Sequence, residues 1–107
     1  MKKLNEQEIT EQLTLVPKWK RKDTKWIERR YRFNEFLDGI TFVNNISAIA
    51  ERENHHPFIQ IQYKMVILNL SSWNENGLTD LDFQLAQEMD ELFVEQTKAR
   101  NNSLEKR

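Results

Sequence analysis

Apolar positions in the first third of the chain follow two different periods. A spacing of four and then three residues predicts a short helix that ends before Pro17. Residues 19–22 form a run short enough for a strand, followed by a turn at residues 23–24. From Trp26 to Phe33 the period changes to two, which predicts a half-buried strand. The helical positions are Ile9, Leu13 and Val16; the strand carries Ile27, Tyr31 and Phe33 on one face and Glu28, Arg30 and Arg32 on the other.

A long amphipathic helix is expected next, with Asn34 as its N-cap. Its apolar arc covers about half of the circumference, which is typical of a helix that faces a core. The helix should end near His55, because the residue before Pro57 is pushed away from helical geometry. The apolar arc consists of Phe36, Ile40, Phe42, Val43, Ile46, Ile49 and Ala50.

Two strands, a loop and a last helix complete the pattern. Residues 58–63 alternate and residues 65–71 are apolar on both faces, so the short gap around Lys64 predicts an antiparallel hairpin. After a loop at residues 72–77, Thr79 and Asp82 form a capping box in which aspartate takes the place of glutamate. A helical stripe then runs from Leu81 to Gln96. The order is αββαββα, which predicts an α+β fold with a four-stranded antiparallel sheet and helices packed on one face.

Composition limits the classes of protein that fit. The 107 residues suffice for a single domain, residues 1–107, with an ordered core at about 4–98 and a polar tail at 99–107 that is expected to fray. A net charge of −1 gives no global attraction to nucleic acid or membrane. The absence of cysteine excludes disulfides and thiol catalysis. With no apolar signal segment and no apolar run of membrane length, we expect a cytoplasmic protein with no membrane and no direct nucleic-acid partner.

The only two histidines, His55 and His56, stand side by side before Pro57, where the helix should give way to a strand. Histidine can give and take a proton near neutral pH, so the pair is a candidate for acid–base catalysis. Adjacent helical residues point about 100° apart, so one imidazole can transfer protons while the other orients a substrate. The alternative is a cap, because histidine near a helix C-terminus also bonds the last carbonyls.

Acidic side chains near the pair admit more than one interpretation. Glu51 lies four residues before His55, which allows a carboxylate–imidazole contact or an ordinary exposed pair. Glu51, His55 and His56 with a further carboxylate would suit a metal, but the divergence of adjacent histidines argues against it. Asp82 stands at the third position of the last helix, where capping and the helix dipole alone favour a carboxylate.

Two aromatic features are also open to two interpretations. Trp73 could stack on a flat heterocycle or simply cover the sheet edge. Residues 18–32 hold eight basic residues interleaved with Trp19, Trp26 and Tyr31, a combination found in nucleic-acid binding. Because Asp23 and Glu28 interrupt that stretch, the solvated face of a hairpin is favoured.

The linked spacing of these residues resembles the pterin-4a-carbinolamine dehydratase (4a-hydroxytetrahydrobiopterin dehydratase) family. The matching pattern is Glu51-x-x-x-His55-His56-Pro57, then Tyr63, Trp73, Gly77-Leu78-Thr79 and Asp82, with Trp19 and Phe33-x-x-Phe36 upstream. The resemblance extends from Leu4 to Val94. It implies an αββαββα fold and dehydration of 4a-hydroxytetrahydropterin to quinonoid dihydropterin, in recycling of the cofactor used by aromatic amino-acid hydroxylases. It implies no metal or organic cofactor, since the pterin is the substrate.

Carried over by position, the resemblance makes His55 and His56 the catalytic and substrate-binding imidazoles. Glu51 and Asp82 become supporting carboxylates, and Pro57 and Trp73 belong to the binding site. This sequence departs from the best-studied type of member at Trp73, where that type has a third histidine. An indole cannot titrate, so the acid–base work falls on His55 with His56.

A small core and an apolar strand at residues 65–71 predict association into a homodimer or homotetramer, because open strand edges are costly. The competing function is a non-catalytic pterin-binding or protein-interaction module. The resemblance implies this alternative because the family includes members that also act as dimerisation partners for a transcription factor. A different pterin, such as a molybdopterin precursor, is a further alternative.

Overall fold

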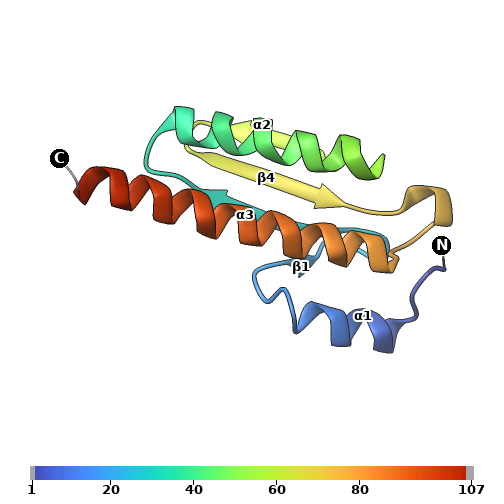
Figure 1. Ribbon diagram of the computed structural model, residues 1–107. Helices are drawn as coiled ribbons and strands as arrows, with labels where there is room; N and C mark the ends of the chain where they lie inside the picture. Colours follow the sequence, from blue (N-terminus) through green and yellow to red (C-terminus); the bar gives the residue numbers. More distant parts are fainter. Residues whose placement is uncertain (1, 106–107) are drawn as a thin grey trace.

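Helices and strands follow one another in the predicted αββαββα order (Figure 1). The computed structural model describes residues 2–105. Its helices are α1 (Glu6–Leu13), α2 (Phe36–Glu53) and α3 (Asp80–Glu105), with a 3-10 turn at Trp73–Glu75; its strands are β1 (Lys20–Arg21), β2 (Ile27–Arg32), β3 (Phe58–Gln62) and β4 (Met65–Leu70). Among these residues, none of the helices combines the length and apolarity that a bilayer span requires.

The four strands form one antiparallel sheet in the order β1-β2-β4-β3, and α2 and α3 lie on one face of it (Figure 1). Tyr31 of β2 shows the layering, because its ring lies 4.6 Å from that of Phe42 in α2 and 5.1 Å from that of Phe93 in α3. The predicted α+β fold is therefore confirmed. The buried core joins all these layers and includes Ile9, Trp19, Ile27, Phe42, Ile46, Val66, Leu68, Leu70, Leu85 and Met89.

One open edge of the sheet lies on β3, not on the strand that the apolar pattern indicated. Strand β4 is apolar on both faces, but it pairs with β2 on one side and β3 on the other, and Ile67 on its outer face is only 4% exposed. Strand β3 pairs only with β4, and all five of its residues are exposed. The sequence showed the hairpin but not which strand would be central.

Two predicted helix limits need correction. Helix α2 is preceded by Glu35 as N-cap, not Asn34, because sheet pairing continues to Phe33, whose N–H donates to the Lys64 carbonyl at 2.8 Å. Helix α3 continues to Glu105, through residues expected to fray. Arg100 explains part of this length: its Nη1 lies 3.0 Å from Asp38 Oδ1 in α2. Residues 106–107 of the predicted tail lie outside the described residues.

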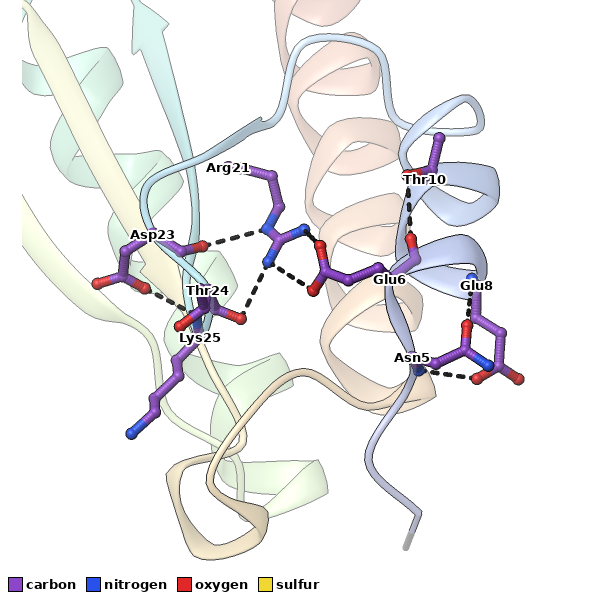
Figure 2. A network of polar contacts seen from close by, with 8 residues as sticks. All are labelled: Asn5, Glu6, Glu8, Thr10, Arg21, Asp23, Thr24 and Lys25. Atoms are coloured by element: carbon purple, nitrogen blue, oxygen red, sulfur yellow. Dashed lines mark hydrogen bonds and ion pairs between the residues drawn. The ribbon is translucent and has the colours of Figure 1, made fainter.

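Helix α1 is attached to the turn between β1 and β2 through Arg21 (Figure 2). The guanidinium donates to both carboxylate oxygens of Glu6, at 3.0 and 3.3 Å, and to the carbonyls of Asp23 and Thr24. Before the helix, the Leu4 N–H donates to the Leu78 carbonyl at 2.8 Å. The N-terminal segment thus supports the chain that leads into α3.

A single carboxylate links α3 to the first half of the sheet. Asp90 Oδ1 accepts hydrogen bonds from Trp19 Nε1 at 2.9 Å, Arg29 Nη1 at 2.7 Å and the Tyr31 hydroxyl at 2.6 Å. Burial, together with the Asp90 charge, raises the pKa of the Tyr31 phenol well above its usual range. Arg29 belongs to the basic stretch at residues 18–32. Its guanidinium faces α3, where Asp90 is its structural partner.

Candidate active site

The end of α2 determines where the two histidines point. Asn54 adopts a left-handed conformation, with φ 48° and ψ 45°, directly after the last helical residue. The His55 N–H then donates to the Ala50 carbonyl at 3.0 Å, which closes the helix end. His55 and His56 follow this turn and precede Pro57 and β3. They therefore lie outside the helix, whereas the predicted contact between Glu51 and His55 assumed that the helix continues to His55.

His55 reaches across to the start of α3. Its Nε2 lies 2.6 Å from Oδ1 of Asp82, whose side chain is fully buried. The other oxygen, Oδ2, accepts from the Thr79 N–H at 2.9 Å and the Ser72 hydroxyl at 2.7 Å. The Thr79 N–H contact is one half of the predicted capping box, so Asp82 caps α3 and holds His55 at once.

His56 pairs with Glu51, which corrects the predicted contact between Glu51 and His55. His56 Nε2 is hydrogen-bonded to Glu51 Oε2. The predicted i,i+4 contact requires helical geometry through His55, and the left-handed Asn54 interrupts it. The backbone turns back on itself there, so the residue five positions after Glu51 reaches it instead. Both groups of this pair are largely exposed to solvent, unlike His55 and Asp82.

A cleft of about 430 Å³ opens between the end of α2, the start of β3 and the segment that leads to α3. That volume lies in the range of small-molecule sites. Trp73 lies on its wall and is 69% exposed, so its indole face is available to a ligand. The lining residues are Asn54, His55, His56, Pro57, Phe58, Ser72, Trp73, Asn74, Glu75 and Leu81.

The cleft brings together most of the residues predicted from the sequence. His55, His56, Pro57 and Trp73 line it, while Glu51 and Asp82 contact the imidazoles from behind. Two imidazoles held by separate carboxylates, beside an exposed aromatic ring, can move protons on a flat substrate. Among the described side chains, residues 2–102, no three His, Asp or Glu are grouped so that they could hold a metal ion.

Sequence analysis missed Phe58 and Ser72 in this site. Phe58 lines the cleft and stacks against Trp26, with ring centroids 4.6 Å apart. Its position on the same side of the strand as Gln60 and Gln62 was the available signal, but an aromatic residue in a strand pattern is usually attributed to the core. Ser72 stands in a loop rich in polar residues, where nothing in the sequence distinguishes a buried hydroxyl from an exposed one.

Comparison with known proteins identifies the family. The family model described as pterin 4 alpha carbinolamine dehydratase matches residues 2–92. The chain belongs to this family. Two relatives provisionally named pterin-4-alpha-carbinolamine dehydratases are similar along nearly their whole length. The chain is 41% identical to the protein from Sulfurisphaera tokodaii, with 88% of this chain and 100% of the relative covered. It is 42% identical to the protein from Picosynechococcus sp., with 84% and 97% covered.

One solved structure agrees with this membership in the dehydratase family, and a second shares the fold. A crystal structure of a transcriptional coactivator/pterin dehydratase from Brucella melitensis superposes with a TM-score of 0.78 at 31% identity, covering 82% of this chain and 95% of that one. A pterin dehydratase-like protein described as a RuBisCO assembly factor in the alpha-carboxysome has a TM-score of 0.61 at 19% identity, covering 70% and 88%. The second likeness shows the fold alone.

Proposed function

We propose that this protein is a hydro-lyase that dehydrates 4a-hydroxytetrahydropterin to quinonoid dihydropterin, in tetrahydropterin recycling. The observation that carries the proposal is the pair of imidazoles in one cleft, His55 on Asp82 and His56 on Glu51, in a chain of the pterin carbinolamine dehydratase family. The cleft has room for a bicyclic ring, and the exposed indole of Trp73 offers a surface for stacking.

The reaction requires two proton transfers and no redox step. The carbon–oxygen bond at position 4a breaks, and the hydroxyl takes up a proton and leaves as water. A neighbouring ring nitrogen loses its proton, and that N–H electron pair becomes the new carbon–nitrogen double bond. An imidazole near neutral pH can perform either transfer. We assign the acid–base work to His55 with His56, and the orientation of their rings to Asp82 and Glu51.

Replacement of His55 tests the assignment. His55→Ala should lower the dehydration turnover by about 10²- to 10⁴-fold, the usual contribution of a positioned acid–base group. Far-UV circular dichroism should remain native, because His55 packs at a cleft and not in the core. Asn74→Ala, which changes another residue of the cleft wall, serves as the matched control and should keep most of the activity. Turnover of His55→Ala within threefold of wild type would refute the role of His55.

The proposed reaction uses no metal or organic cofactor. Each imidazole is engaged by a different carboxylate, which leaves the two without a common point for an ion. Treatment with a chelator should therefore leave the activity and the melting temperature unchanged. Metal that copurifies in stoichiometric amount, and whose removal abolishes activity, would contradict this proposal.

A second candidate function is pterin binding or protein interaction without turnover. The exposed apolar side chains of β3 favour contact with another protein surface, and the similar structure from Brucella melitensis is described as a coactivator as well as a dehydratase. A pterin-binding measurement beside a dehydration assay separates the two functions. Binding without any turnover would favour the interaction module.

A further inference from the structure

The carboxylate that holds His55 is itself held by two hydroxyl groups. Ser72 and Thr79 are buried, and their side-chain oxygens lie 2.8 Å apart. Ser72 Oγ also lies 2.7 Å from Asp82 Oδ2. The cap of α3 accounts for the contact of Asp82 with the Thr79 N–H, but it does not require the Ser72 hydroxyl.

The number of available protons determines which group donates in each hydrogen bond of this cluster. An ionised carboxylate only accepts hydrogen bonds, so Ser72 uses its single hydroxyl proton on Asp82. The contact between the two hydroxyls then needs the proton of Thr79. On the other side of the carboxylate, His55 Nε2 must be the donor. The hydrogen bonds therefore run from Thr79 to Ser72 to Asp82, and from His55 to Asp82.

This direction determines the tautomer of His55. When the ring is neutral and Nε2 carries the proton, Nδ1 is the atom with the free electron pair. Among the side chains that the structure describes, His55 is hydrogen-bonded only through Nε2, and it lines the cleft. Nδ1 is thus the atom that can accept a proton from a substrate, provided that Asp82 stays in place.

We propose that Ser72 is a positioning residue, which acts through Asp82 to keep His55 in the Nε2–H tautomer with Nδ1 free for the substrate. The proposal rests on the dehydration proposed above. Without the Ser72 hydroxyl, Asp82 Oδ2 keeps only the Thr79 N–H, and the carboxylate gains freedom to rotate away from the ring. A share of His55 then adopts the other tautomer, which cannot take up a proton at Nδ1.

The neighbouring serine supplies a matched control. Ser71 is also buried, but its hydroxyl has no hydrogen-bond partner among the described residues. Ser72→Ala should lower kcat about 10-fold with little change in KM, the lower end of the range for groups that orient a functional side chain. Ser71→Ala should have wild-type kinetics. Ser72→Thr keeps the hydroxyl and should restore kcat. Ser72→Cys keeps the side-chain volume with only a weak donor, and should behave like Ser72→Ala if the latter does not fold.

Nitrogen NMR of histidine-labelled protein gives a readout that does not depend on activity. At a pH where His55 is neutral, the wild type and Ser71→Ala should show the Nε2–H form, and Ser72→Ala a mixture of tautomers. A wild type in the Nδ1–H form, or a Ser72→Ala variant with unchanged tautomer and kcat within twofold, would overturn the proposal. A tautomer shift in a protein that never dehydrates the pterin would support the positioning role and refute the proposed function.

Discussion

At the scale of single residues, the exposed indole of Trp73 leads to a prediction about how the cleft binds a pterin. The indole is largely exposed beside both histidines, so it can lie against a pterin ring with a stacking free energy on the order of 1 kcal/mol. Trp73→Ala should therefore raise KM several-fold and change kcat less. If both constants and pterin binding stay unchanged, the indole is only a cover at the edge of the sheet.

Trp73→His is the informative companion variant, because it introduces a group that can titrate. If the new imidazole reaches the substrate, turnover should rise and the pH–rate profile should gain an additional limb. Steady-state kinetics across the pH range measures both effects.

Most residues of the candidate site could be predicted from the sequence, but the carboxylate partner of each imidazole could not. The two adjacent histidines before Pro57 can be recognised directly in the sequence, and their spacing to Trp73 and Asp82 indicated the family. The partner of each imidazole depends on the left-handed turn at Asn54, which breaks the helical spacing used to pair Glu51 with His55. The contact between Ser72 and Asp82 could not be predicted, because it depends on the conformation of the loop that joins them.

At the scale of elements, the attachment of α3 to the sheet depends on Asp90 and its three donors. Tyr31→Phe removes one of these donors in a fully buried position and should lower the free energy of unfolding by about 1–2 kcal/mol at pH 7. Chemical denaturation measures the change. Tyr63→Phe is the matched control, because Tyr63 is exposed at a turn and its hydroxyl should contribute nothing.

The same hydroxyl gives a pH dependence whose sign follows from the raised pKa of Tyr31. The fold favours the neutral phenol, so the stabilisation is complete below the unfolded-state pKa of about 10 and decreases as the pH rises above it. The difference in stability between wild type and Tyr31→Phe should therefore narrow between pH 10 and 11, by about 1.4 kcal/mol per pH unit at most. A constant difference over that interval would contradict the buried, neutral phenol.

Most element positions were predictable because the apolar period differs between helices, about 3.6, and half-buried strands, about 2. The links between elements were not. Trp19 and Asp90 are 71 positions apart, and no local pattern pairs them. The extension of α3 beyond its apolar stripe was equally unpredictable, because it involves an ion pair of Arg100 with Asp38 in another helix.

At the scale of the whole molecule, the exposed edge of β3 predicts self-association. Ile59 and Ile61 are 39% and 41% exposed on the helix side of an edge strand that pairs only with β4, and Tyr63 at its end is 70% exposed. Pairing this edge across a twofold axis would satisfy its backbone groups and bury these side chains. We expect a homodimer or a homotetramer in solution.

Light scattering at micromolar concentration tests this expectation. A particle near 13.0 kDa would be the monomer and would refute it. Ile61→Lys places a charge on the apolar side of the edge and should shift the protein toward that mass. Gln60→Lys, on the opposite face of the same strand, is the control and should leave the assembly intact.

The contrast between the two imidazole–carboxylate pairs has a consequence for the response to ionic strength. Side chains of His56 and Glu51 are 52% and 76% exposed, whereas those of His55 and Asp82 are 14% and 0% exposed. Dissolved ions screen charges in water over about 10 Å at 0.1 M, but they act much less on buried pairs. At a pH where both imidazoles are protonated, salt therefore weakens the outer pair more than the inner one. Ionic strength is then a way to perturb the contact of His56 while the contact of His55 is kept.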